Sequence, residues 1–233
     1  MAPFFPHLLK LLCLSQLAAA NVEKAIFLGP EGVPVPLAHP TLEDLHIDTL
    51  TPQENWSLRT RISAKFPSES SPHGDTTWLL LDNLQAGQRY EVRICWAATQ
   101  PTSFTLRTHE LSTVFDTPDL IASLWAYSTA RQPADATPKA QTSGERRSSV
   151  LFLEIIAAAD FFTTNATLMQ NPPLVDADIT LDPFLFNVLP RSLVPTIGYI
   201  IVVAAGSFMV ARWVVAQIHT IISNDPQKQK KQQ

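Results

Sequence analysis

The chain has 233 residues, a formal net charge of −4, and 45% hydrophobic against 16% charged residues. This mildly acidic balance gives no electrostatic basis for binding nucleic acid. The part of the chain between the two terminal segments described below is long enough for one domain with a packed core, and marginal for two.

Residues 1–20 have the pattern of a secretory signal peptide. Basic groups at His7 and Lys10 precede a compact apolar run at 11–17, and small residues follow at 18–20. The run is too short for a membrane anchor, because spanning takes about 20 apolar residues. We therefore expect cleavage after residue 20 and a mature chain that begins at Asn21.

Short apolar runs separated by proline-bearing connections follow, which is typical of strands in an antiparallel sandwich. The clearest alternation puts Tyr90, Val92, Ile94 and Trp96 on one face of a strand. The expected strands are 25–28, 57–66, 76–81, 90–96, 103–108 and 150–156. Residues 21–190 are therefore predicted to form one mainly β domain.

The start of the 90–96 strand carries a motif that sharpens this fold prediction. Leu84, the turn residue Gly87 and Tyr90 resemble the leucine, glycine and tyrosine that open a late strand in fibronectin type III and related folds. In those folds the tyrosine hydroxyl closes a corner of the sandwich. The resemblance implies a fibronectin- or immunoglobulin-like antiparallel sandwich.

The region before the last expected strand departs from the β pattern. Residues 119–126 are predicted to form a short helix, with Pro118 near its start. Residues 129–149 are rich in Ala, Thr, Pro, Ser and Gln and have no apolar periodicity, so we expect a disordered loop there. The loop interrupts the domain and does not end it, because the apolar run at 150–156 resumes the core.

Cysteine is scarce in this chain. Cys13 lies in the expected signal peptide, which leaves Cys95 alone and allows no disulfide within the mature chain. Cys95 stands between Ile94 and Trp96 in an apolar strand, so we expect a small buried side chain rather than a reactive thiol.

Two sequons are present, Asn55-Trp56-Ser57 and Asn165-Ala166-Thr167. On a secreted or lumenal domain, each is a plausible N-glycosylation site and indicates exposed backbone.

No pattern of catalytic residues is evident. The sequence has no Gly-x-Ser-x-Gly elbow, no phosphate-binding glycine loop and no dinucleotide fingerprint, and it has no Cys or His spacing for a metal. The four histidines outside the terminal segments have no spacing that builds a site; they are His39, His46, His73 and His109. We therefore expect a protein that is not an enzyme and needs no cofactor or metal.

One acidic cluster comes closest to a catalytic motif. Asp176-Ala177-Asp178, with Asp182 nearby, fits the literal Asp-x-Asp pattern of metal-dependent glycosyltransferases. Such sites need a nucleotide-binding domain around them, and this stretch contains proline and leads into an apolar segment. We predict a solvated linker here.

Residues 192–211 lie between Arg191 and Arg212 and contain no charged side chain. As a helix, a segment of this length covers about 30 Å, the thickness of the bilayer hydrocarbon. Trp213 is placed to anchor at the interface, and 214–222 can continue the helix. Basic residues are in excess on the C-terminal side, which predicts a lumenal N-terminal domain and a cytosolic tail over 212–233.

The tail itself carries a targeting pattern. Lys230 and Lys231 stand fourth and third from the C-terminus, which matches the dilysine signal by which the retrieval coat returns type I membrane proteins to the endoplasmic reticulum (ER). Such a signal is an address read by a receptor. The polar residues 223–233 exclude a GPI-attachment signal, which ends in its apolar tail. We therefore expect an ER-resident membrane protein.

Two features near the membrane point to a membrane partner. The block 182–191 is apolar, aromatic and bounded by prolines, and we expect Phe184 and Phe186 to lie at the lumenal interface. Small residues within the span, Gly198, Gly206 and Ser207 above all, allow close approach of another helix. A plain single-pass anchor is the alternative.

The overall layout resembles a known family. A signal segment, Asn21-Val22-Glu23, a small β-rich domain holding Gly87 and the 90–96 strand, one span and a dilysine tail together resemble the fungal non-catalytic subunit of GPI mannosyltransferase II. In that family the subunit accompanies a multi-pass mannosyltransferase that adds the second mannose to the GPI precursor. The resemblance implies an accessory subunit that stabilises a polytopic ER mannosyltransferase and carries no catalytic residues.

Other ER proteins share this layout. They include the partner of GPI mannosyltransferase I and the alpha subunit of the translocon-associated complex, so a translocon-associated or client-binding type I membrane protein is the alternative function. Residues 223–233 contain none of the phenylalanines that cycling cargo receptors use for export, which favours a stationary resident. A lumenal enzyme would need a polar pocket that the sequence does not indicate.

Overall fold

The computed structural model describes residues 20–37, 41–69, 71–132 and 144–223. These fall into a β-rich unit that ends at Val188 and a C-terminal unit that begins at Leu189. The expected signal peptide, except for its last position, and the dilysine pair Lys230 and Lys231 lie outside the described residues.

One sheet of the β-rich unit, here called the open sheet, is antiparallel throughout. Its order within this unit is β1 (Ala20–Leu28), β6 (Arg89–Ala97), β9 (Val175–Leu185) and β4 (Ser57–Ile62). One row of directly opposed residues runs across all four strands through Val22, Cys95, Asp178 and Arg59.

The second sheet, here called the covered sheet, is built around its longest strand, β8 (Glu145–Ala159). β8 pairs antiparallel with β2 (Val33–Pro36), β5 (Asp75–Leu84) and β7 (Thr102–Glu110). A short strand, β3 (Asp48–Leu50), adds to β5 in parallel. The expected all-antiparallel arrangement is therefore wrong at β3, and the covered sheet is mixed.

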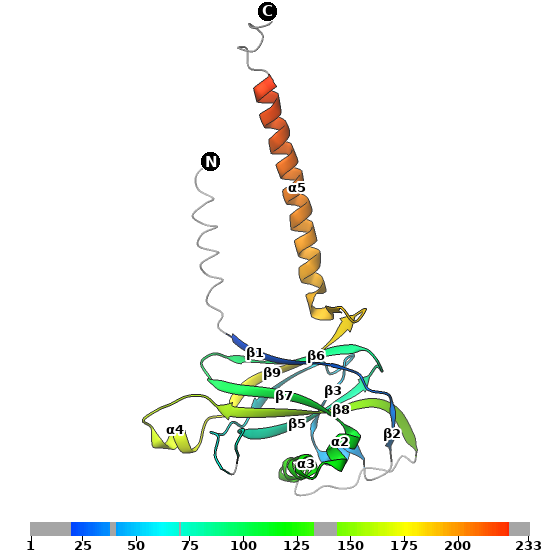
Figure 1. The fold of residues 1–233 in the computed structure, drawn as a ribbon, viewed down its shortest axis with the longest axis vertical. Coiled ribbons are helices and arrows are strands. Elements are labelled where there is room, and N and C mark those ends of the chain that lie inside the picture. Colours follow the sequence, from blue (N-terminus) through cyan, green and yellow to red (C-terminus); the bar gives the residue numbers. More distant parts are fainter. Residues whose placement is uncertain (1–19, 38–40, 70, 133–143, 224–233) are drawn as a thin grey trace, which may run out of the picture. The chain divides into compact units, whose positions relative to one another are not determined.

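Apolar side chains fill the space between the two sheets and also cover the far face of the covered sheet. The first cluster joins Val92 and Ile94 of the open sheet to Leu79, Leu81 and Leu153 of the covered sheet. The second lies between the covered sheet and the elements α2 (Leu111–Asp116), α3 (Pro118–Ala130) and the short 3-10 turn η2 (Leu42–Leu45). Figure 1 shows α2 and α3 beside β5 and β8. This second cluster contains Trp78, Leu80, Phe152, Val114 and Leu124. Strands β5 and β8 are thus buried on both faces, which explains their uninterrupted apolar runs.

The predicted corner at Tyr90 is present. The hydroxyl of Tyr90 accepts a hydrogen bond from the backbone N–H of Gln85 at 2.9 Å, and its ring stacks on Phe27 with centroids 5.8 Å apart. Burial raises the pKa of the Tyr90 phenol, against the lowering effect of the Gln85 hydrogen bond, so the group stays protonated. A Cβ at Gly29 would meet the carbonyl oxygen of Gln85 at 2.2 Å, so this corner requires glycine there.

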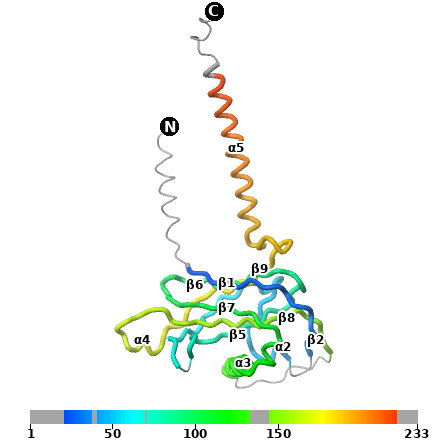
Figure 2. Tube along the Cα trace, viewed as in Figure 1, coloured from blue at the N-terminus to red at the C-terminus, as the bar shows by residue number. Residues whose placement is uncertain are grey.

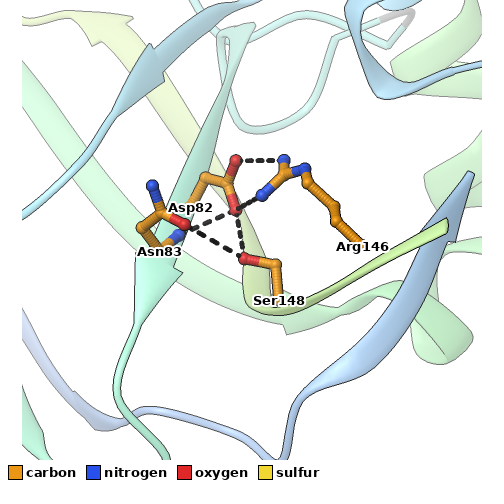
Figure 3. A network of polar contacts seen from close by, with 4 residues as sticks. All are labelled: Asp82, Asn83, Arg146 and Ser148. Atoms are coloured by element: carbon orange, nitrogen blue, oxygen red, sulfur yellow. Dashed lines mark hydrogen bonds and ion pairs between the residues drawn. The ribbon is translucent and has the colours of Figure 1, made fainter. Parts of the chain in front are cut away.

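A polar network fixes the bulge near the end of β5 (Figure 3). The buried carboxylate of Asp82 accepts from the Asn83 N–H at 2.7 Å, from the Ser148 hydroxyl at 2.7 Å and from both terminal nitrogens of Arg146. Burial raises the pKa of Asp82, but hydrogen bonds from Arg146, Ser148 and Asn83 outweigh burial and lower it. Asn83 has a φ of 55°, the left-handed conformation that asparagine tolerates well.

All six predicted strands occur, but β2, β3 and β9 of the β-rich unit are not predicted from the sequence. The stretch predicted to be a solvated linker is β9, which pairs with β6 on one side and β4 on the other. Asp182 in this strand is buried, whereas Asp178 binds Arg59 through two hydrogen bonds of 2.6 and 2.7 Å. The linker prediction is therefore wrong.

The expected loop over 129–149 is also too long at both ends. Helix α3 continues through Ala130, and β8 begins at Glu145, where Arg146 and Ser148 join the Asp82 network. Residues 133–143 of this loop lie outside the described residues.

The C-terminal unit consists of β10 (Leu189–Pro190), a 3-10 turn η3 (Arg191–Leu193) and α5 (Val194–Ser223). The tube in Figure 2 shows α5 as one continuous helix. By length and composition this helix is long and apolar enough to cross a membrane. It continues past Trp213 through 214–222, as the sequence predicts.

Removing the corner hydroxyl should destabilise the β-rich unit. Tyr90→Phe leaves the Gln85 N–H without its acceptor, which costs about 1–3 kcal/mol of unfolding free energy. We expect a lower urea midpoint for the full chain in detergent, followed by tryptophan fluorescence. Tyr127→Phe is the control, because that hydroxyl accepts its hydrogen bond from an exposed side chain, Arg131. Equal midpoints for both variants and the wild type would contradict the role of the corner.

The Asp82 network should make stability depend on acidic pH. The folded pKa of Asp82 lies below its unfolded value, so its stabilising effect is complete above about pH 5 and is lost as the pH falls through the folded pKa. Asp82→Asn should therefore be less stable than the wild type at pH 7, and the difference should shrink towards pH 3.

Urea titrations across that pH range measure this difference. Asp178→Asn is the control, because the exposed Arg59–Asp178 pair contributes little in water. A gap between wild type and Asp82→Asn that is independent of pH would show that the network does not act through the charge of Asp82.

Candidate interaction surfaces

The two sequons differ in whether the side-chain amide nitrogen of the asparagine donates a hydrogen bond. Asn165 caps α4 (Ala166–Gln170), because its side-chain oxygen accepts from the Thr167 N–H at 3.0 Å. Its amide nitrogen has no partner among the described residues, so a glycan there leaves the cap intact. In contrast, the amide nitrogen of Asn55 donates to the Thr49 carbonyl at 2.5 Å. Both residues are exposed, but only Asn165 offers a free amide nitrogen.

An apolar cavity of about 280 Å³ lies at the end of the sandwich where β9 begins. Phe161, Leu168 and Val175 line it together with the Pro172-Pro173 pair, and Gln100 is among its few polar groups. A lining of this kind suits an apolar side chain better than a charged ligand. Among the described residues, no cluster of His, Cys, Asp and Glu could hold a metal ion.

The outer face of the open sheet combines an apolar edge with ion pairs. Val22, Ile26 and Leu28 of β1 are exposed along one edge. On β6 the buried Glu91 carboxylate lies 3.4 Å from Lys24 and 3.6 Å from Arg93. The face is therefore largely charged, and its apolar character is confined to β1.

Cys95 lies on this outer face and is only half-buried, so the prediction of a buried side chain is wrong. The physical reason is the alternation of β6: Val92, Ile94 and Trp96 take the inward positions, and Cys95 falls between them on the other face.

A tight turn follows β9 and ends the β-rich unit. The Val188 N–H bonds to the Leu185 carbonyl at 3.1 Å, and Phe186 and Asn187 have φ values of 52° and 58°. These left-handed values define a type I′ turn, which usually carries Asn-Gly. A left-handed conformation costs a residue with a side chain about 1–2 kcal/mol, so Phe186 is strained.

The turn is fastened to the start of β6. The Asn187 side chain accepts from the Arg89 N–H at 2.8 Å and donates to the Gly87 carbonyl at 2.9 Å. The two phenylalanines predicted to form a partner interface therefore differ. The Phe186 ring is 98% exposed, but Phe184 is only 7% exposed, with the Arg89 guanidinium over its ring at 5.9 Å. In this structure Phe184 supports the fold and offers no free surface.

The other predicted interface residues lie on α5. Gly198, Gly206 and Ser207 are exposed, and nothing lies within 4 Å of a Cβ built on either glycine. Gly198 and Gly206 are about two helical turns apart, so they fall on neighbouring stripes of the helix surface.

The described residues thus form a β-rich unit with exposed apolar side chains at its edge and turn, followed by a long apolar helix. Residues 11–213 match the family described as GPI-mannosyltransferase II co-activators, and the chain belongs to this family. The match covers every described strand of the β-rich unit and most of α5.

A curated relative gives a shorter match. The chain is 38% identical over 45 residues to a GPI mannosyltransferase 2 subunit of Schizosaccharomyces pombe. That match covers 19% of this chain and 25% of the relative. No solved structure matches the chain.

The missed strand β9 had a signal in the sequence. Its inward residues Val175, Ala177, Ile179 and Leu181 alternate with polar residues, which is the period of a half-buried strand. The acidic side chains of Asp176 and Asp178 on their own indicate a metal motif or a solvated linker, whereas the alternation around them indicates a strand.

Glycosylation should occur at Asn165 in preference to Asn55. Thr167→Ala removes the first sequon and keeps the Asn165 cap, because the backbone N–H of residue 167 remains. Ser57→Ala removes the second and keeps the Asn55 hydrogen bond to Thr49. We expect endoglycosidase treatment to change the gel mobility of the wild type and of Ser57→Ala, and to leave Thr167→Ala unchanged. A mobility change lost only in Ser57→Ala, or absent in all three, would contradict this.

Proposed function

We propose that this protein is a non-catalytic membrane subunit that stabilises a polytopic mannosyltransferase of the ER, which adds the second mannose in GPI-anchor biosynthesis. The observation that carries the proposal is the family match, which covers the β-rich unit and reaches residue 213 in the C-terminal unit. A co-activator of a mannosyltransferase implies a catalytic partner.

The proposed topology follows from the ends of the chain. Residues 1–20 act as a cleaved signal peptide, residues 192–211 cross the membrane mainly as α5, and residues 212–233 are cytosolic. The β-rich unit is then lumenal, where Asn55 and Asn165 can receive glycans. Lys230 and Lys231 return the protein to the ER through the retrieval coat. The apolar length of α5 and the excess of basic residues after it support this arrangement.

The fibronectin- or immunoglobulin-like character of the sandwich also belongs to this proposal. The Tyr90 hydroxyl bound to the Gln85 backbone supports it, because that hydrogen bond is the hallmark of a tyrosine corner.

Contact with the catalytic partner is proposed to be made within the membrane by Gly198, Gly206 and Ser207. Lipid and apolar side chains are equally apolar, so helices in a bilayer associate through close packing and hydrogen bonds. Small residues allow that close approach, and the glycines of α5 have open space around them. We leave Phe184 out of this interface, because it is buried in the β-rich unit.

A larger side chain at position 206 should reduce the amount of the catalytic partner that co-purifies. Gly206→Leu adds a side chain where a helix would pack, so we expect several-fold less of the co-purified mannosyltransferase in a mild-detergent pull-down analysed by mass spectrometry. Phe208→Trp is the control, because it adds bulk two residues from Gly206, where the side chain turns to about the opposite face of the helix.

The two variants and the wild type separate the outcomes. Unchanged recovery with Gly206→Leu would remove this glycine from the interface. A wild-type pull-down dominated by translocon components or secretory clients, with no multi-pass mannosyltransferase, would overturn the subunit proposal itself.

A further inference from the structure

We propose that the turn Leu185–Val188 is a membrane-contacting tip, which inserts the ring of Phe186 into the boundary between lipid headgroups and acyl chains. The inference rests on the proposed function, because it requires α5 to cross the bilayer. It concerns lipid, and not the catalytic partner, as the surface that this turn contacts.

The first argument is that the exposed ring of Phe186 does not stabilise the fold. Its backbone has a φ of 52°, a conformation that bulky residues rarely adopt, and its ring is 98% exposed. A strained residue normally persists because surrounding contacts require it. The ring makes no such contacts within the β-rich unit, so the reason for a large apolar side chain at this position lies outside the unit.

The second argument is that the turn is held firmly in place. Asn187 is bonded to Gly87 in the turn before β6 and to Arg89 at the start of β6, and the Gln88 side-chain amide donates to the Phe184 carbonyl. These bonds fix the residues on both sides of Phe186 to the open sheet. The ring is therefore held on a rigid turn, so little conformational entropy is lost when it inserts into the bilayer interface.

The third argument is the chemistry of the surroundings. Leu185 and Val188 flank the ring and are exposed, and Leu28 at the end of β1 lies directly opposite Arg89 in the sheet. Arg89 is itself exposed. An apolar tip with one guanidinium beside it fits the bilayer interface, where aromatic rings lie at headgroup depth and arginine binds phosphate.

The fourth argument is covalent reach. Only six peptide steps separate Val188 from Val194, the first residue of α5. An extended chain covers at most about 3.6 Å per residue, so the turn stays within roughly 22 Å of the start of the helix. If α5 spans the bilayer, the turn is held close to its surface. A projecting single ring needs no matching pocket in a fluid interface, which favours lipid over a protein partner.

The depth of the turn can be measured with a fluorescent probe. The full chain, with Cys13 and Cys95 replaced by serine, is given one cysteine by Phe186→Cys, Phe162→Cys or Ile201→Cys. Each variant is labelled with an environment-sensitive nitrobenzoxadiazole dye and reconstituted alone into phosphatidylcholine vesicles. Quenching by lipids with a doxyl group at acyl carbon 5 or 12 then reports depth.

Phe162 is the matched control, because it is an aromatic residue that is 85% exposed, next to the cavity residue Phe161 at the end where β9 begins. Ile201 lies within α5 and tests the span. We expect the label at 186 to be quenched several-fold more than the label at 162, and more by carbon 5 than by carbon 12. The label at 201 should respond more to carbon 12.

The outcomes are distinct. Equal, weak quenching at 186 and 162 with strong quenching at 201 would overturn the tip proposal and leave the span standing. Weak quenching at 201 would show that α5 does not cross the bilayer, and would overturn the tip proposal as well. Phe186→Gly adds a second measure: because glycine adopts a left-handed φ freely, its urea midpoint should equal or exceed that of the wild type. A clearly lower midpoint would show that the ring stabilises the fold, and would overturn the proposal.

Discussion

The burial of β5 and β8 on both faces is the constraint on which the rest of the β-rich unit depends. Leu79 and Leu153 face the open sheet, whereas Trp78 and Phe152 face α2 and α3. Two strands with no solvated face need a cover on each side. The open sheet supplies one cover, and the helix layer between β7 and β8 in the chain supplies the other. The unit is therefore three layers deep, although its sequence reads as that of a two-layer sandwich.

Much of this architecture could be predicted from sequence, and the exceptions have physical reasons. The alternation at 90–96 and the apolar run at 150–156 identified central strands, and the Leu84, Gly87 and Tyr90 motif identified a corner whose hydrogen bond is present. The parallel strand β3 was missed because three residues are too few to show a period. β9 was missed because its outward positions are acidic, and those charges are balanced by residues far away in sequence, such as Arg59.

The candidate interaction residues were less predictable than the fold. Composition identified Phe184 and Phe186 as one apolar block, but two neighbouring positions in a strand and a turn can face opposite environments. Only the register of β9 against β6 shows that Phe184 lies under Arg89 and that Phe186 projects from the turn. The same register explains Cys95, whose face was decided by the alternation of its strand and not by its apolar neighbours.

The order of the strands has a consequence for how the protein is made. β9 occupies a central position in the open sheet, between β6 and β4, yet it is the last strand of the unit to leave the ribosome. Until β9 is made, β6 and β4 each lack their pairing strand on one side. Unpaired strand edges promote aggregation. Completion of the sheet thus coincides with synthesis of the residues that begin α5. A chain that ends before Val175 would therefore carry an open seam through the middle of its sheet, between β6 and β4.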